Sequence, residues 1–161
     1  MRTMTAAEIT ALHAARTAKG DGYAPSLAEC LDAAREGRLY DIDTASSGHD
    51  GLEIGDDADE VLVSWASDCG CESVRGWSAE RIELSEEPDH EPRVALHNDP
   101  SRPTYVHEMT DEEVALCLDN VDLMDDDIRN ALDGAGDDDR EWLALYAARH
   151  EAVHGAPWCL P

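Results

Sequence analysis

Phenylalanine is absent from the 161 residues of this chain, and lysine occurs once, at Lys19. Nowhere do eighteen apolar residues follow one another, so the sequence predicts no membrane span. Residues 1–10 carry a single arginine and no long apolar stretch, unlike a secretory signal peptide. The cysteines number five, and an odd count is typical of reduced thiols rather than of a disulfide framework. We therefore expect a cytoplasmic protein.

Motifs of common enzymes are missing as well. The chain has no glycine-rich phosphate-binding loop and no G-x-S-x-G nucleophile motif. The segment that starts at Asp41 departs from a calcium-binding EF-hand loop, because Ser46 stands where glycine is required and Leu52 where a bidentate glutamate belongs. We expect neither an enzyme nor a bound cofactor.

Acidic side chains are what the sequence has in excess. There are 37 Asp and Glu residues against 12 Lys and Arg residues, which gives a net charge of -25. Residues 1–40 contain five acids and five bases, so residues 41–161 carry the whole net charge. A surface this negative repels nucleic acid and anionic lipid and attracts basic proteins. The expected partner is a basic nucleic-acid-binding protein or complex, with no direct binding to nucleic acid or membrane.

Residues 1–40 have the pattern of a helical hairpin with no net charge. Thr5 with Glu8 forms one capping-box pattern, and Ser26 with Glu29 forms a second. The turn Gly20-Asp21-Gly22 is expected to end the first helix. Two antiparallel helices are therefore predicted at the N-terminus.

Residues 41–109 predict an acidic loop followed by a small sheet. Residues 41–60 contain eight acids, no base and three glycines, which is typical of a loop with short extended pieces. Segments rich in branched and aromatic residues then alternate with turn residues, at 61–65, 81–84, 93–97 and 104–107. This spacing predicts an antiparallel sheet of three to four strands.

Residues 110–155 return to helix. Thr110 with Glu113 forms a third capping box, and Val114, Cys117 and Leu118 belong to the inward-facing stripe. Further helices are predicted over 125–132 and 137–154, where Asp125-Asp126-Asp127 and Asp137-Asp138-Asp139 supply carboxylates that cap free N–H groups. The whole chain is predicted to be one α+β domain over residues 1–161.

The HExxH spelling occurs once, at His150-Glu151-Ala152-Val153-His154. In zinc proteases the two histidines of this motif bind the metal and the glutamate activates water. Here the helix is expected to end at once, and Cys159 is the sole metal-binding side chain that follows. The same histidines are explained by their place near a helix C-terminus, where basic side chains interact favourably with the helix dipole. We take the motif as fortuitous.

A second pattern that suggests zinc is Cys69-Gly70-Cys71, with His49, His90, His97 and His107 in the same region. Structural zinc sites usually separate paired cysteines by two residues and use a second pair, which this region lacks. We expect a plain tight turn at these cysteines and no metal. A small zinc-binding protein, using Cys69 and Cys71 or His150 and His154, remains an alternative.

Small, strongly acidic proteins without enzyme motifs include phage- and plasmid-encoded mimics of nucleic acid. By its size and by the charge of residues 41–161, the chain resembles these anti-CRISPR and antirestriction inhibitors, which occupy the DNA groove of a host nuclease complex. Its tail, residues 142–158, looks like the end of small mobile-element proteins of no known function. The resemblance implies a non-enzymatic inhibitor acting in the host cytoplasm by protein–protein contact, and it transfers no individual functional residue.

Charge density sets a condition on mimicry. Duplex DNA carries about one charge per 110 Å² of its surface. A folded chain of this mass exposes roughly 7,900 Å², which spreads the net charge at about one per 320 Å². Mimicry therefore requires the carboxylates to gather on one face. The residues expected to bind the partner are Asp56, Asp57, Asp59, Glu60, Asp111, Glu112, Asp119, Asp122, Asp125, Asp126 and Asp127.

The competing interpretation is an ordinary cytosolic protein from a salt-adapted or GC-rich source. Abundant Asp and Glu, almost no lysine and alanine-rich helices are typical of salt-adapted proteins, and arginine in place of lysine also follows from GC-rich coding. Composition alone leaves this alternative open.

Overall fold

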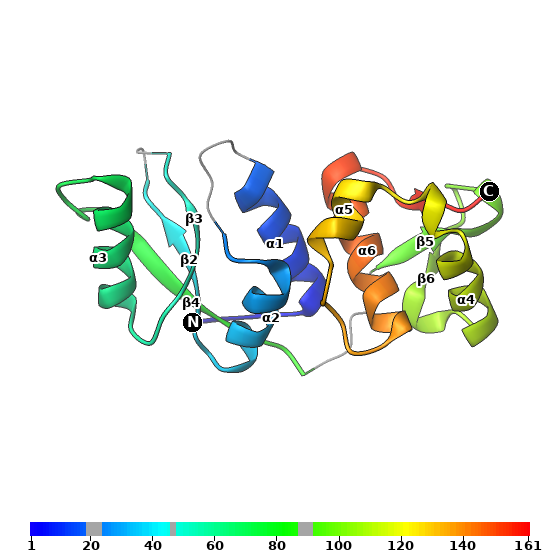
Figure 1. Ribbon diagram of the computed structural model, residues 1–161, viewed down its shortest axis with the longest axis horizontal. Coiled ribbons are helices and arrows are strands. Elements are labelled where there is room, and N and C mark those ends of the chain that lie inside the picture. The colour runs from blue at the N-terminus through cyan, green and yellow to red at the C-terminus, as the bar shows by residue number, and fades with distance from the viewer. Residues whose placement is uncertain (19–23, 46–47, 87–91) are drawn as a thin grey trace.

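Helices and short strands alternate through the chain in the computed structural model, which describes residues 1–18, 24–45, 48–86 and 92–161 (Figure 1). The helices are α1 (Ala6–Ala18), α2 (Leu27–Arg35), α3 (Ala58–Cys69), α4 (Asp111–Asp119), α5 (Asp126–Ala131) and α6 (Asp139–His154). The strands are β1 (Arg2–Met4), β2 (Leu39–Asp43), β3 (Gly51–Ile54), β4 (Ser78–Leu84), β5 (Arg93–Ala95), β6 (Thr104–Tyr105) and β7 (Trp158–Cys159).

The N-terminal sheet lies between two helical layers. Its strand order is β1-β4-β2-β3, with β1 and β4 parallel and the other pairs antiparallel. Successive side chains of a strand point to opposite faces. Accordingly, Leu39 belongs to the core under α1 and α2, whereas Tyr40 and Ile42 pack with Val61 and Trp65 of α3. Figure 1 shows α3 on one side of this sheet and α1 with α2 on the other.

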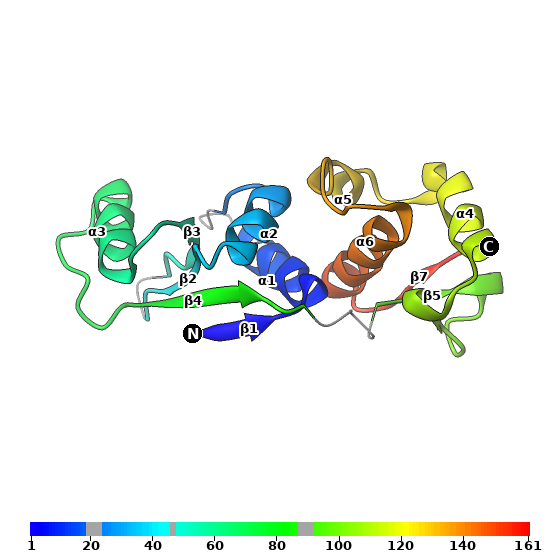
Figure 2. The same ribbon diagram turned by 90° about the horizontal axis from the view of Figure 1, so that it is seen from below.

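The C-terminal part contains the second sheet, in the order β6-β5-β7, and helices α4, α5 and α6. Helix α6 lies beside α1, which joins the two parts of the molecule (Figures 1 and 2). One cluster of buried side chains runs through both parts, from Ile9 and Leu27 to Leu143 and Leu160. The elements are therefore arranged along the long axis, with α3 at one end and α4 at the other (Figure 1).

The α+β class, the N-terminal helical hairpin and the C-terminal helices are as the sequence predicts. Each predicted capping box forms in both directions. In α2 the Ser26 hydroxyl accepts from the backbone of Glu29, whose carboxylate accepts from the backbone of Ser26. The same exchange joins Thr5 with Glu8 and Thr110 with Glu113. Local cap chemistry therefore positions these helix starts.

Residues 61–65 correct one strand prediction, because they lie inside helix α3. Their branched and aromatic side chains favour a strand locally. Asp57, however, caps the helix by accepting from Asp59 N and Glu60 N, and Gly70 ends it in the left-handed conformation. Val61 and Trp65, one helical turn apart, are both buried. Tertiary packing and end caps thus decide the conformation of this segment.

The predicted antiparallel sheet also needs correction. The strands are divided between two sheets, and β1 with β4 and β5 with β7 pair in parallel. Strands β1 and β7 span only three and two residues, too few for an alternating pattern to reveal them. The predicted turn Gly20-Asp21-Gly22 and His90 lie outside the described residues.

In the described part of the chain, every helix is too short or too polar to cross a lipid bilayer.

Candidate interaction surface

Helix α4 carries an acidic, solvent-facing stripe. Its buried side is formed by Val114 and Cys117, so the opposite side faces solvent. Glu112, Leu116 and Asp119 lie there, four and three residues apart, and all three are exposed. Residues at these spacings are neighbours on a helix surface. A leucine is therefore flanked by carboxylates one turn before it and one turn after it.

The stripe continues beyond the end of α4. The next turn, the 3₁₀ segment η3 (Val121–Leu123), exposes Asp122 and Leu123. Leu116 is 47% exposed and Leu123 is 55% exposed, both large for an apolar side chain. These leucines were missed as candidate residues. The signal was available for Leu116, which falls outside the inward stripe that includes Val114 and Cys117.

Asp125 at the start of α5 serves the fold. Its carboxylate accepts from the backbone N–H groups of Asp127 and Ile128, and it lies 3.0 Å from Nε2 of His154. These donors lower the pKa of Asp125, the Ile128 N–H first and then His154. Its own backbone N–H donates to the Tyr146 hydroxyl over 2.9 Å. Asp125 is half-buried, so we treat it as a structural cap.

Two arginines neutralise part of the acidic surface. Arg140 Nη2 lies 2.9 Å from Asp111, and Arg129 Nη1 lies 2.9 Å from Asp126. Within the residues that the structure describes, the remaining predicted carboxylates of this surface form no ion pair within 4.0 Å. They are Glu112, Asp119, Asp122 and Asp127. We call these four carboxylates, with Leu116 and Leu123, the α4–α5 surface.

A hollow of about 330 Å³ adjoins this surface between the start of α4 and the start of α6. Its walls hold the carboxylates of Asp111, Asp138 and Asp139 beside the apolar side chains of Val114 and Ala115, with Arg140. Asp138 also caps α6 by accepting from Glu141 N over 2.8 Å. Asp138 and Asp139 were assigned only cap roles from the sequence, and their position beside α4 depends on tertiary packing.

The other predicted carboxylates lie elsewhere. Asp56, Asp57, Asp59 and Glu60 surround the start of α3, at the opposite end of the long axis from α4 (Figure 1). Asp56 is paired with Arg38 over 2.7 Å, and Asp57 caps α3. Seven of the eleven predicted residues therefore lie along α4, η3 and α5, from Asp111 beside the start of α6 to Asp125 beside its end, and the other four lie apart from them.

Average charge density remains below that of DNA. The accessible surface is 8879 Å², and the net charge is -25, so each net charge has roughly 360 Å². Duplex DNA has about 110 Å² per charge.

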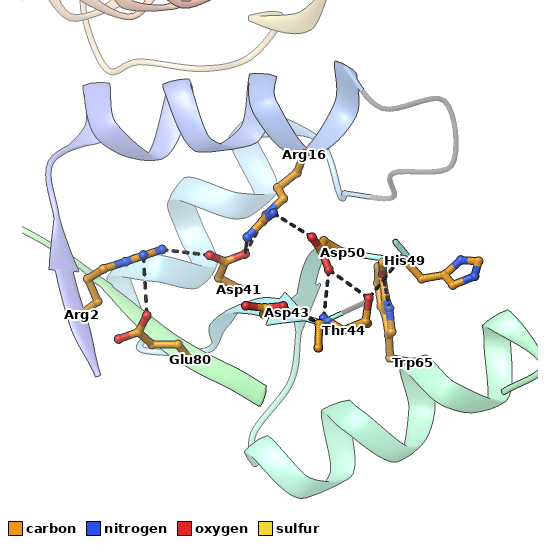
Figure 3. Close-up of polar contacts among 10 residues, drawn as sticks. Arg2, Arg16, Asp41, Asp43, Thr44, His49, Asp50, Trp65 and Glu80 are labelled. Carbon is orange, nitrogen blue, oxygen red and sulfur yellow. Dashed lines mark hydrogen bonds and ion pairs between the residues drawn. The ribbon is translucent and has the colours of Figure 1, made fainter. Parts of the chain in front are cut away.

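A second polar cluster ties β2 to α1 (Figure 3). The nearly buried carboxylate of Asp41 lies 3.0 Å from Arg2 Nη2 and 2.7 Å from Arg16 Nη2. Arg16 also reaches Asp50 over 3.5 Å, and Asp50 accepts from the hydroxyl of Thr44 over 2.9 Å. Nothing in the sequence pattern indicated this cluster, because its members come from separate elements. Among the described residues Arg2 Nε is buried without a hydrogen-bond partner, but the carboxylate of Asp41 is paired with both arginines, so we treat the cluster as structural.

The side chains of the HExxH pattern are engaged separately. Glu151 lies 2.9 Å from Arg93 Nη2, and His154 contacts Asp125. His150 Nδ1 lies 3.0 Å from the carbonyl of Ala156, so it donates a hydrogen bond there. Desolvation by burial, first among the causes, lowers the pKa of His150. This arrangement differs from a metal site, in which both imidazoles turn their free nitrogens toward one ion.

The candidate zinc ligands around Cys69 and Cys71 are also dispersed. Cys69 is the last residue of α3 and Cys71 follows the helix, whereas His97 lies beyond β5 and His107 beyond β6. Within the described ranges, no group of three or more His, Cys, Asp or Glu side chains is placed to hold a metal ion.

Comparison of the chain with models of known protein families, with curated proteins and with solved structures finds no match.

Proposed function

We propose that this protein is a non-enzymatic inhibitor that binds the nucleic-acid-binding surface of a basic partner through its α4–α5 surface. The observation that carries the proposal is the exposure of Leu116 and Leu123 among carboxylates that form no ion pair with the other described residues. Such an arrangement has a cost for the folded chain, because like charges repel and apolar side chains remain in water. Binding to a basic partner would relieve both.

The chemistry of the surface fits a partner that normally holds phosphates. Arginine and lysine side chains that bind phosphate also bind carboxylate, and arginine does so through two parallel hydrogen bonds. Glu112, Asp119, Asp122 and Asp127 offer such acceptors. The acidic hollow beside α4 has room and charge for a long cationic side chain. The class of partner is therefore a DNA- or RNA-binding protein, as in the anti-CRISPR and antirestriction inhibitors.

The two exposed leucines give the surface a component that DNA itself does not have. Charge attracts a partner over long range and sets the association rate, whereas buried apolar contacts lower the dissociation rate. Leu116 and Leu123 can pack on the aliphatic stems of the partner's basic side chains. We therefore expect binding that weakens with added salt but retains a salt-insensitive part.

The test is displacement of a labelled DNA duplex from purified RNA-guided nucleases and restriction endonucleases. The wild-type protein should release the duplex from at least one of them. The variant Asp119→Lys/Asp122→Lys/Asp127→Lys should lose this effect by about 100-fold or more, since several charge-assisted contacts are reversed together.

The matched control is Asp59→Lys/Glu60→Lys/Glu72→Lys, which changes the net charge equally on the other part of the molecule. All six positions are exposed, so circular dichroism should show both variants folded. If the control loses displacement as much as the first variant, the effect comes from net charge and not from the α4–α5 surface. If the wild type displaces no duplex at low salt, the proposed function is wrong.

Leu116→Ser/Leu123→Ser separates the apolar contribution. We expect its dissociation from the partner to be roughly tenfold faster with little change in the association rate. An unchanged dissociation rate would mean that the two leucines do not contribute to binding and that only the carboxylates do.

A further inference from the structure

The C-terminal end of α3 brings two thiols together. Cys69 is the last residue of the helix, and Gly70 follows it with φ 73° and ψ 22°. This left-handed conformation, which favours glycine, turns the chain back so that Cys71 N donates to Ala66 O over 2.9 Å. The Sγ atoms of Cys69 and Cys71 lie 2.7 Å apart as a result.

The pair differs from the other thiols of the chain in its accessibility. Cys30 and Cys117 are buried, and burial raises the pKa of Cys30 to about 12 and that of Cys117 to about 11. Cys69 and Cys71 are partly exposed at the surface. Cys159 is also partly exposed, but among the described residues its sulfur contacts a carbonyl oxygen, that of Pro157, rather than a thiol. Among the described residues, only Cys69 and Cys71 are both accessible to solvent and next to another thiol.

Two sulfur atoms are enough for a disulfide but too few for a structural metal site. Structural zinc takes four ligands, and the described residues provide no group of three. A disulfide needs only the second sulfur, at a bond length of about 2.05 Å. Because the Sγ atoms are already in contact, side-chain rotation rather than a backbone rearrangement closes the bond.

We propose that Cys69 and Cys71 are a reversible redox pair that exchanges with small-molecule disulfides of the glutathione class. In the first step a cysteine thiolate attacks one sulfur of the small disulfide, forming a mixed disulfide and releasing one small thiolate, which takes up a proton. In the second step the other cysteine loses its proton to water and attacks the protein sulfur of the mixed disulfide. A second small thiol leaves, so two protein thiols are oxidised and one small disulfide is reduced to two thiols.

The hydrogen bond between the sulfurs sets the order of attack. The pKa of Cys71 is raised, first by its hydrogen bond to Cys69 and then by desolvation and by the charge of Cys69. While both thiols are protonated, Cys69 Sγ is the donor to Cys71 Sγ. The raised pKa of Cys71 means that Cys71 keeps its proton longer, so once the pair has lost one proton Cys71 becomes the donor to Cys69. Cys69 attacks first, and Cys71 resolves the mixed disulfide.

Neighbouring charge adds a preference among small disulfides. Asp68 and Glu72 flank the pair in the sequence, and both are exposed. An anionic disulfide such as oxidised glutathione meets repulsion there, whereas dicationic cystamine is attracted. Cystamine should react about tenfold faster at low ionic strength, and the difference should shrink with added salt.

The test uses the full chain in mixtures of reduced and oxidised glutathione, quenched with acid and labelled with N-ethylmaleimide. Peptide mass analysis should find the peptide with Cys69 and Cys71 lighter by two hydrogens and unlabelled in oxidised mixtures, and labelled twice in reduced ones. Cys159 should never form an intramolecular bond to either. Labelling of both Cys69 and Cys71 in fully oxidised glutathione would overturn the proposal.

Single variants test the order of the two steps. Cys71→Ser should trap a stable glutathione adduct on Cys69, because the resolving thiol is gone. Cys69→Ser should form its adduct about tenfold more slowly, since the remaining thiol lacks the activated partner. Cys159→Ser is the control and should oxidise at Cys69 and Cys71 like the wild type. Equal reaction rates for Cys69→Ser and Cys71→Ser would remove the assigned order, and a Cys71→Ser protein that forms no adduct would contradict the redox pair itself.

Discussion

Arg149 of α6 donates a hydrogen bond to Nδ1 of His13 on α1, over 2.8 Å. On the other side of the ring, His13 Nε2 lies 2.8 Å from the carbonyl oxygen of Pro25. A carbonyl only accepts, so Nε2 carries the proton and Nδ1 is the acceptor. The imidazole is therefore neutral, and it connects the helix that covers the N-terminal sheet with the helix of the C-terminal part.

The pKa of His13 is lowered, by burial first and by the charge of Arg149 as well, against the opposing effect of Pro25. Protonation would place a cation against the guanidinium. A histidine whose pKa is lowered in the folded state contributes fully to the stability of the fold at pH values above the ordinary histidine pKa of about 6.5. This contribution is lost as the pH falls below that value. We expect urea unfolding to occur at lower denaturant at pH 5.5 than at pH 7.5.

The variant His13→Gln should lose a large share of that pH dependence. The matched control is His150→Gln. The pKa of His150 is lowered too, but its ring contacts Ala156 rather than Arg149. If His13→Gln keeps the full difference in unfolding midpoint between the two pH values, His13 is not the responsible group.

Removing the carboxylate of Asp41 should destabilise the fold strongly. Asp41→Asn leaves Arg2 and Arg16 without the acceptor they share, at a position where the carboxylate is only 8% exposed. We expect the free energy of unfolding to fall by roughly 2–3 kcal/mol, less than for a fully buried pair because Arg2 is partly in water. Asp43→Asn, an exposed aspartate of the same strand, should change it by under about 0.5 kcal/mol. Equal losses in denaturant titrations would show that the ion pairs do not matter.

Loss of the α5 cap should be measurable in the same way. Asp125→Ala removes the acceptor for two backbone N–H groups and for His154, so we expect a loss of about 1 kcal/mol. Asp126→Ala removes only an exposed pair with Arg129 and should cost under about 0.5 kcal/mol. Since the pKa of Asp125 is lowered, its contribution should persist down to its ordinary pKa of about 3.9 and disappear as the pH falls further. A larger loss for Asp126→Ala would contradict this assignment.

Salt should stabilise the protein modestly. Carboxylates of the α4–α5 surface repel one another, and added ions screen this repulsion. We expect the thermal midpoint to rise between about 0.05 M and 1 M NaCl, with a smaller rise for Asp119→Lys/Asp122→Lys/Asp127→Lys. The protein should nevertheless be folded at the lower salt concentration. Unfolding there would favour the salt-adapted interpretation over the inhibitor.

Helix ends were the part of the fold most readily predicted from sequence. A capping box is a local exchange between residues three apart, so Ser26 with Glu29 and Thr110 with Glu113 could be recognised without any tertiary information. The strand prediction for residues 61–65 is wrong because branched side chains favour a strand locally, whereas the cap at Asp57 starts a helix just before them. The parallel strand pairs could not be found, since a strand of two or three residues has no periodicity to recognise.

The candidate surface was predictable only in part. Aspartates at helix starts were recognised as caps, but Asp125 was also assigned to partner binding, and its contacts with His154 and Tyr146 depend on α6. The pairing of Arg140 with Asp111, 29 residues apart, likewise follows from packing. The exposure of Leu116 followed from helical spacing alone, which is a signal to look for in acidic helices.

The two parallel strand pairs also constrain how fast the chain can fold. Strand β1 pairs with β4, and β5 with β7, which are far apart in the sequence. Each sheet can therefore be completed only after a long loop of chain has closed. Loop closure loses entropy before the new contacts repay it, and such nonlocal pairings slow folding. The helical hairpin of α1 and α2 needs no distant partner to begin. We therefore expect rapid formation of helix, followed by a slower phase in which both sheets close around α1 and α6.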